Sequence, residues 1–239
     1  MIYILIPVFN EEQNIENLFN ELNALKLDEE VFFVFADDGS SDKSVELLGL
    51  YFAGKNHIVL KNGENKGPGY TFNHGFTWIL ENAKSDSDRV VTMEADTTSD
   101  LGILPHMLTI SGMGYDLVLA SVYAQGGGFD QTSFIRKFLS SLSNAAIRFL
   151  LGIQVNTYTS FYRVYHIGLL RRIKNKYPQL ITENGFICKL EILMKAVKTG
   201  VKIVEVPMLL QSTKRKGKSK MKILKTSIEY LRFAFFKRL

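Results

Sequence analysis

Two short acidic stretches of this sequence have the residue types of a site that binds a metal and a phosphate. Asp37-Asp38-Gly39-Ser40 places two carboxylates on a tight turn, where Gly39 permits close approach of the backbone. Glu94-Ala95-Asp96 places carboxylates at i and i+2 around a small residue. Carboxylates can hold a divalent cation that bridges phosphate oxygens and stabilises a leaving diphosphate. The same residues could also form only a helix-capping turn and a solvated loop, so the surrounding sequence must decide between a binding site and these structural roles.

The context is a chain in which short apolar runs alternate with helical patterns. Buried β-strands are predicted over residues 2–7, 31–36, 58–60, 89–93 and 116–122. Between them, Asn10 is expected to cap a helix that reaches Leu25, a second helix ends near Phe52, and a third runs from Gly67-Pro68-Gly69 to Ala83. This alternation predicts an α/β fold with a Rossmann-like, mostly parallel sheet flanked by helices.

Polar residues follow three of these strands directly. Parallel sheets bind ligands beyond the carboxyl ends of their strands, so these residues are expected at one edge of one sheet. They are Asn10, Asp37, Asp38, Glu94 and Asp96. Three acidic turns at one edge are the main indication of a binding site.

The second half of the chain has a different character. A helix is predicted over 132–151, an extended segment over 157–165, a helix over 185–198 and a strand over 201–206. Glu191, inside the otherwise apolar 185–198 helix, is expected either to be a solvated helix residue, which is favoured, or to be a buried acid that faces the acceptor. The organisation expected is a main domain at 1–212, with a donor half at 1–122 and an acceptor half at 123–212. A basic segment at 213–239 follows it and includes an amphipathic helix at Met221–Leu239.

Composition limits the classes of function. The net charge is +5 and the isoelectric point is near 9.1, which favours an anionic partner. Cys188 is the single cysteine, so neither an internal disulfide nor a cysteine zinc site is expected. No apolar stretch approaches the roughly 20 residues that span a bilayer. Despite the basic tail, no base-reading motif is present, and nucleic acid is not expected as a partner.

The sequence resembles the family-2 glycosyltransferases of GT-A fold. The resemblance rests on residues 6–12 (IPVFNEE), 37–42 (DDGSSD) and 65–69 (NKGPG). Later motifs resemble the branch of dolichyl-phosphate mannose synthase and the polyprenyl-phosphate sugar transferases. They are RKFLS at 136–140, NAAIRFLLG at 144–152, TSFYRVY at 159–165, GFICKLEILMKA at 185–196, VEVP at 204–207 and GKSK at 217–220.

The resemblance implies an inverting hexosyltransferase that moves a sugar from a GDP- or UDP-sugar to dolichyl or undecaprenyl phosphate, with magnesium or manganese. The nucleotide-sugar contacts that it implies are Pro7, Asn10, Glu11, Asp37, Asp38, Lys66, Gly67 and Ala95. The implied metal ligands are Glu94 and Asp96, and the implied acceptor-phosphate contacts are Arg136, Ser140, Ser219 and Lys220. The implied catalytic set is Asp96, Arg136, Ser140, Arg163 and Lys220.

Several positions depart from the family pattern. Glu94 stands where the family usually has aspartate, Thr98 where a glutamine often sits, and Val122 where a phosphate-binding arginine is usual. Two alternatives therefore stay open: transfer to a glycan or another lipid acceptor, and a non-catalytic protein that binds nucleotide sugars. The acceptor and the basic tail together predict a peripheral protein on the cytoplasmic face of a membrane, in cell envelope glycan biosynthesis, with a membrane partner subunit as an alternative anchor.

Overall fold

The structure is a computed structural model, and it describes residues 1–131, 141, 144–145, 147–149, 152, 155–217 and 223–236. Most of the helix predicted over 132–151 lies outside the described residues. So do four of the predicted site residues, Arg136, Ser140, Ser219 and Lys220.

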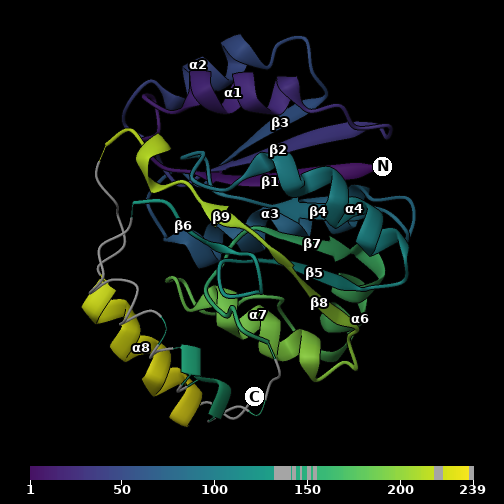
Figure 1. The fold of residues 1–239 in the computed structure, drawn as a ribbon. Coiled ribbons are helices and arrows are strands. Elements are labelled where there is room, and N and C mark those ends of the chain that lie inside the picture. Colours follow the sequence, from purple (N-terminus) through teal and green to yellow (C-terminus); the bar gives the residue numbers. More distant parts are fainter. Residues whose placement is uncertain are drawn as a thin grey trace.

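The described residues form a seven-stranded sheet in the order β3-β2-β1-β4-β7-β5-β8 (Figure 1). The strands are β1 (Ile2–Val8), β2 (Val31–Asp37), β3 (His57–Lys61), β4 (Arg89–Thr92), β5 (Leu117–Ser121), β7 (Arg163–His166) and β8 (Ile203–Pro207). All neighbouring pairs are parallel except those of β7, which runs antiparallel to β4 and β5. The predicted fold class, a mostly parallel sheet flanked by helices, is confirmed.

Helices cover both faces of this sheet because its strands are apolar on both sides. Along β1, Tyr3 and Leu5 join one core, and Ile2, Ile4 and Ile6 join the other. The first core is closed by α3 (Pro68–Asn82), α6 (Ile167–Lys176) and α7 (Cys188–Val197). The second is closed by α1 (Ile15–Ala24), α2 (Ser44–Tyr51) and α4 (Leu104–Gly112).

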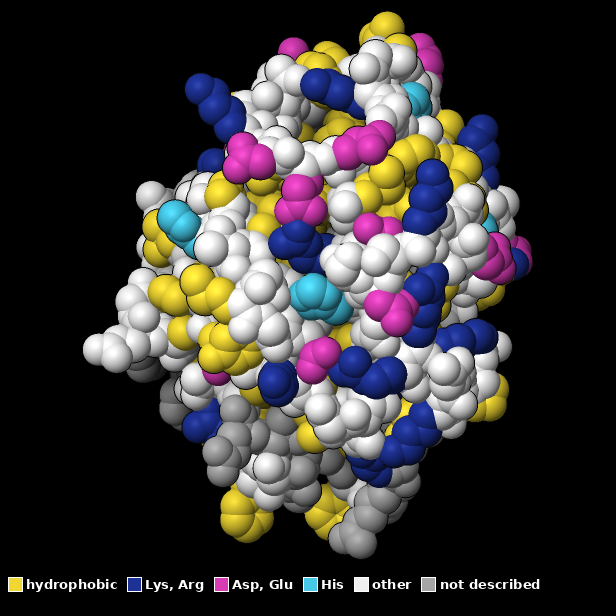
Figure 2. Space-filling model, turned by 90° about the vertical axis from the view of Figure 1, so that its right-hand side faces the viewer, with side chains coloured by type: hydrophobic (Ala, Val, Ile, Leu, Met, Phe, Trp, Pro, Cys, Tyr) yellow, Lys and Arg dark blue, Asp and Glu magenta, His cyan; other side chains and the backbone are white. Residues whose placement is uncertain are grey.

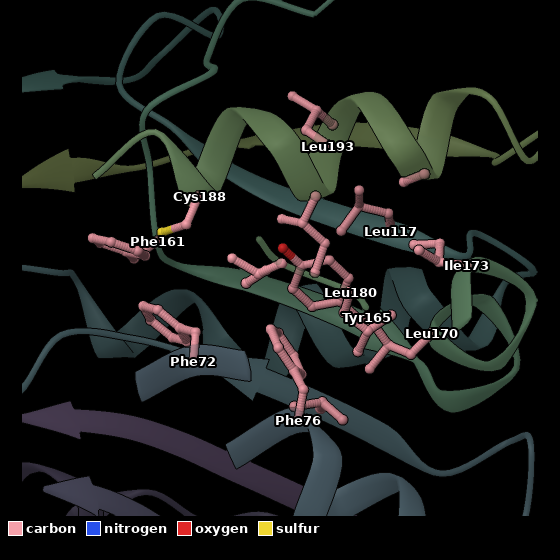
Figure 3. Packing of buried hydrophobic residues seen from close by; sticks show 14 of the residues in the cluster. Phe72, Phe76, Leu117, Phe161, Tyr165, Leu170, Ile173, Leu180, Cys188 and Leu193 are labelled. Atoms are coloured by element: carbon pink, nitrogen blue, oxygen red, sulfur yellow. The ribbon is translucent and has the colours of Figure 1, made fainter. Parts of the chain in front are cut away.

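Aromatic rings join the two halves of the chain in the first core (Figure 3). Phe72 of α3 stacks on Phe161 with ring centroids 4.6 Å apart, and Phe76 meets Tyr165 of β7 edge to face at 5.7 Å. Burial of each such side chain contributes about 1.5–3 kcal/mol. Since β7 and β8 complete the sheet that begins with β1, the predicted donor and acceptor halves share one sheet and this core.

The last described helix, α8 (Ile223–Phe236), is joined to the segment that precedes α7, and Figure 1 shows it at the C-terminal end of the chain. The Tyr230 hydroxyl donates a hydrogen bond to the carbonyl of Phe186 at 2.7 Å, and Phe233 is also buried. Ile228 and Phe235 are exposed. Several side chains of this helix lie outside the described set, so its amphipathic character stays a prediction. No helix among the described residues is long and apolar enough to cross a membrane.

Three sequence predictions need correction. Asn10 does not cap a helix: its φ is +50°, residues 11–14 form a turn, and α1 begins at Ile15. Helices α4 and α6 were not predicted, because the first is short and the second carries its apolar positions among basic residues. Glu191 is not solvated. It is fully buried in α7 and pairs with Lys195 at 2.7 Å.

The edge of the sheet where β1 begins carries mixed charge. Figure 2 shows this face, on which basic and acidic side chains are interspersed. Arg89 pairs with Glu29, Arg171 with Asp86, and Arg172 with Asp116. Such exposed pairs contribute little stability. The residues that could do chemistry lie at the opposite edge.

Candidate active site

A cleft of about 1000 Å³ opens at the carboxyl ends of β1, β2, β4 and β5. Three stretches form its polar side: residues 7–14 after β1, Asp38, Ser41 and Asp42 after β2, and Asn65, Gly67 and Pro68 at the start of α3. Glu94, Ala95 and Asp96 lie in the same cleft after β4. The predicted convergence of the three acidic turns is therefore present in the structure.

Asp38 holds the loop that closes the polar side of the cleft. Its carboxylate accepts hydrogen bonds from the backbone N–H groups of Lys66 and Gly67, each at 2.9 Å, and from the Asn62 side chain at 3.0 Å. Asp38 is only 5% exposed, so the bonds that a buried carboxylate requires come from this loop. The side chain thus fixes the shape of the pocket wall.

The turn after β1 is tied to the turn after β2. The N–H of Asn10 donates to the Ser40 hydroxyl at 2.9 Å, and the N–H of Ser41 donates to the Asn10 side chain at 2.8 Å. Asn10 and Thr97 are the non-glycine residues with positive φ among the described part of the chain. Asn10 lines the cleft, and Thr97 is a buried residue between two that line it, Asp96 and Thr98. Strained backbone is common in functional sites.

Two glycines let the acceptor half contact the start of α3. A Cβ on Gly67 would lie 2.5 Å from the carbonyl oxygen of Asn184, and one on Gly69 would lie 1.7 Å from that of Glu183. The N–H of Gly69 donates to the Asn184 carbonyl at 2.8 Å. Residues 183–184 are in turn fixed by Glu191, whose carboxylate accepts the N–H of Glu183 at 2.9 Å.

The acid pair has two different environments. Asp96 accepts the backbone N–H and the hydroxyl of Thr98 on one oxygen, and the guanidinium of Arg215 on the other. Glu94 is half-buried in the cleft. Burial and, second, the neighbouring charge of Asp96 raise the pKa of Glu94 to about 7.

Arg215 comes from a segment that crosses the mouth of the cleft. We call residues 211–217 the crossing segment. The N–H of Gln211 donates to the Thr98 carbonyl at 2.9 Å, and Lys216 exchanges backbone hydrogen bonds with the Asn14 side chain at 3.0 and 3.1 Å. The segment therefore joins the far end of the sheet to the start of α1 and brings Arg215 to the acid pair.

A second cation missed by the sequence analysis is Lys189, the second residue of α7. It lines the cleft and is 5% exposed. Its ammonium lies 3.8 Å from the ring centroid of Phe161 and 5.3 Å from that of Phe186. Burial lowers the pKa of Lys189 to about 8, opposed by the charge of Glu94. A lysine inside an apolar helical pattern gave no signal in the sequence.

The residues predicted to contact the nucleotide sugar and the metal fall into three groups in the structure. The residues that line the cleft are Pro7, Asn10, Glu11, Asp38, Gly67, Glu94, Ala95 and Asp96. Asp37 lies behind its turn, where it accepts the N–H groups of Gly39 and Ser40. The backbone N–H of Lys66 donates to Asp38, whereas its ammonium points elsewhere. The ammonium lies 3.7 Å from the Glu64 carboxylate and over the Tyr70 ring.

Arg163 does not fit its predicted place in the catalytic set. The side chain is 1% exposed and does not line the cleft. Its guanidinium donates to the carbonyls of Ser160, Tyr158 and Lys189 at 2.8–3.0 Å and to the Tyr165 hydroxyl at 3.1 Å. These bonds satisfy the buried cation, so Arg163 supports the floor beneath Lys189 rather than contacting substrate.

The acid pair fits a divalent cation that a substrate helps to bind. Among the described residues, no three His, Cys, Asp or Glu side chains are grouped to hold a metal alone. Magnesium, however, is usually held by one or two carboxylates together with substrate phosphates. After burial, the charge of Asp96 is the second cause of the raised pKa of Glu94, and a cation bound to the two carboxylates would offset this repulsion.

The family model described as glycosyl transferase family 2 matches residues 3–174. The chain therefore belongs to this family and is a glycosyltransferase. The match spans the turns after β1, β2 and β4 that line the polar side of the cleft.

Two relatives are similar over most of the chain. The polyprenol monophosphomannose synthase of Mycolicibacterium smegmatis is 28% identical over 221 residues, which are 91% of this chain and 80% of the relative. The undecaprenyl-phosphate mannosyltransferase of Micrococcus luteus is 28% identical over 218 residues, which are 91% of this chain and 86% of the relative.

A solved structure has the same fold. Glucosyl-3-phosphoglycerate synthase from Mycobacterium tuberculosis, crystallised with Mn²⁺, uridine diphosphate and glucosyl-3-phosphoglycerate, superposes with a TM-score of 0.67. The comparison covers 98% of this chain and 79% of that one at 18% sequence identity. At this identity the likeness concerns the fold alone.

Proposed function

We propose that this chain transfers a sugar from a nucleoside diphosphate sugar to a polyprenyl phosphate, with inversion at the anomeric carbon. The observation that carries the proposal is the single cleft whose polar, acidic side faces an apolar wall. The wall consists of Val122, Phe129, Phe161, Phe186, Met208, Leu210 and Tyr230. A polar, anionic donor fits the first side, and an acceptor with an apolar tail fits the second.

The donor half of the site is built from the turns after β1 and β2. Pro7, Asn10 and Glu11 would contact the base and ribose, and Asp38 would keep the Lys66–Gly67 backbone in place against them. The donor's diphosphate would then lie towards β4. The solved structure with uridine diphosphate and Mn²⁺ supports this class of donor for the fold.

Glu94 and Asp96 would hold magnesium or manganese against the donor's diphosphate. When bound, the metal would neutralise charge on the leaving diphosphate. Asp96 is already oriented by Thr98, and it would exchange its bond to Arg215 for the cation. Arg215 would then be free to contact the diphosphate, because the crossing segment keeps it at the cleft mouth.

The chemical step needs little from the protein beyond positioning. A phosphate oxygen of the acceptor attacks the anomeric carbon as the bond to the diphosphate oxygen breaks on the opposite side. A phosphate monoester is already a nucleophile, so no general base is required. Arg136, Ser140, Ser219 and Lys220 keep their proposed roles as acceptor-phosphate contacts, although they lie outside the described residues.

Attachment at the cytoplasmic face of a membrane is part of the proposal, because the acceptor would be a membrane lipid. One relative above is named for undecaprenyl phosphate, and the other for polyprenol monophosphomannose. Phe149, Ile228 and Phe235 are exposed apolar side chains, at 89%, 56% and 66%. Basic residues of the crossing segment lie on the exposed surface, and anionic lipid favours such residues by about 1 kcal/mol each. A membrane partner subunit would serve the same purpose.

A transfer assay tests the proposal. Purified protein with Mg²⁺ or Mn²⁺ would be given radiolabelled GDP- and UDP-sugars and a panel of acceptors: polyprenyl phosphate, polyprenol, and soluble glycans. The proposal predicts label in the lipid phase with polyprenyl phosphate alone, and its loss in Asp96→Asn. Label on a glycan would point to the other acceptor class. Donor binding without any transfer would point to a non-catalytic protein.

A further inference from the structure

The cleft contains a buried cation that neither the family match nor the mechanism above uses. Lys189 is 5% exposed, yet it lines the cleft. Among the described residues, no hydrogen bond or ion pair to its ammonium is found. Its contacts are the faces of Phe161 and Phe186. A cation over an aromatic face recovers only part of the free energy of hydration that burial removes, so the site is built for an anion.

The other basic residues of the cleft are less suited to bind an anionic ligand. The basic side chains among its described lining are Lys189, Arg215 and Lys216. Arg215 is paired with Asp96, and Lys216 is exposed on the crossing segment. Lys189 is therefore the enclosed cation available to a ligand in the described part of the cleft.

The position of Lys189 selects one of the two anions of the proposed reaction. It projects from the start of α7, against two aromatic residues of the apolar wall. The carboxylates whose charges act on Lys189 are those of the acid pair, Glu94 first and Asp96 less strongly. A phosphate at Lys189 would thus carry its apolar tail along the wall and face the acid pair.

We propose that the Lys189 ammonium binds the phosphate of the acceptor and holds it for attack. This inference rests on the proposed function, which supplies the acceptor class. Arg163 supports the arrangement by donating to the backbone carbonyl of Lys189 at 2.9 Å. Lys189 is thereby a binding residue for a phosphate monoester on an apolar chain, and a lipid without phosphate would lose this contact.

The test compares binding of farnesyl phosphate and farnesol by calorimetry, with nucleoside diphosphate and Mg²⁺ present. Wild type should prefer the phosphate by at least about tenfold, because charge-assisted hydrogen bonds contribute about 1.5–3 kcal/mol. Lys189→Met should lower the preference by about tenfold, since the other proposed phosphate contacts remain, and leave nucleoside diphosphate affinity within about twofold. Lys189→Arg should retain most of it. Lys198→Met, at the exposed end of the same helix, is the control for charge and should match wild type.

The outcomes separate this inference from the proposed function. A phosphate preference in Lys189→Met as large as that of wild type overturns the inference. So does a parallel loss of nucleoside diphosphate affinity, since a structural role would lower both. A Lys189-dependent preference without transfer to any polyprenyl phosphate supports the inference and counts against the proposed function. Inorganic phosphate, titrated separately, should bind more weakly than farnesyl phosphate if the apolar wall contributes.

Discussion

At the scale of single residues, charge compensation organises the cleft. Glu94 and Asp96 are countered by Lys189 and Arg215, which come from α7 and from the crossing segment. Each acid therefore lies near a cation that the chain itself supplies. A metal bound with the donor would replace one of these cations beside the acids. Two variants test this balance of charges.

Arg215→Ala should increase the affinity of the donor-free protein for Mn²⁺ by about tenfold. The guanidinium and the cation compete for the same oxygen of Asp96, and a hydrogen bond between charged groups contributes about 1.5–3 kcal/mol. Titration followed by electron paramagnetic resonance would measure the change. Arg172→Ala, which removes a distant exposed ion pair, is the control. Unchanged or weaker Mn²⁺ binding in Arg215→Ala would show that the two do not compete.

Glu94→Gln should change the pH dependence of stability. The folded-state pKa of Glu94 is raised from 4.5 to about 7, so protonation favours folding. This stabilisation is complete below pH 4.5 and is lost as pH rises through about 7. The uncharged variant escapes the loss. With chelator present, its melting temperature should equal wild type at pH 5 and exceed it at pH 8 by about 2–8 °C, or roughly 1–2 kcal/mol. A constant difference across this range would contradict the assignment.

The sequence predicted some of these residues and missed others for a physical reason. The turns at Asp38 and Asp96 could be placed because a strand end fixes where the next residues lie. Lys189 and Glu191 could not, since burial of a charged side chain depends on partners far along the chain. Arg163 was misjudged in the same way, because the four groups that accept its hydrogen bonds cannot be read from its position at the start of β7.

At the scale of elements, the start of α3 is where the two halves of the chain meet. Gly67 and Gly69 allow residues 183–184 to contact the first turn of the helix. Asp38 holds the same turn from the donor side. The closing wall of the donor pocket therefore depends on α7, through Glu191, as well as on β2. The alternation of strands and helices predicted the elements, but not this contact between the halves.

Gly69→Ala should destabilise the protein by about 1–3 kcal/mol, because the new methyl group would collide with a backbone carbonyl that cannot rotate away. That loss lowers the melting temperature by roughly 2–12 °C in a domain of this size. Donor affinity should fall with it. Gly54→Ala is the matched control, since a Cβ there has nothing within 4 Å. If both alanine variants melt alike, the contact of 183–184 with α3 does not stabilise the fold.

At the scale of the whole molecule, the two ends of the sheet's strands differ in what they carry. The edge where β1 begins carries interspersed charges and paired arginines (Figure 2). The opposite edge has the cleft, the crossing segment and α8. The sequence indicated this polarity through residues that follow strands. It did not reveal that β7 enters the sheet antiparallel, preceded by Phe161 of the apolar wall.

Membrane docking through α8 should depend on its exposed apolar side chains. The double variant Ile228→Ser/Phe235→Ser should lose most of its binding to vesicles that contain anionic lipid, because the apolar face would no longer enter the interface. Buried Phe233 is untouched, so the fold should remain. Flotation with vesicles would measure the bound fraction. The control is Leu50→Ser/Met113→Ser, at two exposed positions outside α8. Equal flotation of both double variants would exclude α8 as the docking element.

We expect the cleft to bind a nucleoside diphosphate between the turn at Asp38 and the acid pair, and calorimetric titration of GDP and of UDP with Mn²⁺ tests this. At least one of the two nucleotides should bind at a ratio of one to one. Its affinity should fall by at least about tenfold in both Asp38→Asn and Asp96→Asn and stay unchanged in the exposed control Asp28→Asn. Binding of neither nucleotide, or full affinity in either cleft variant, would contradict it.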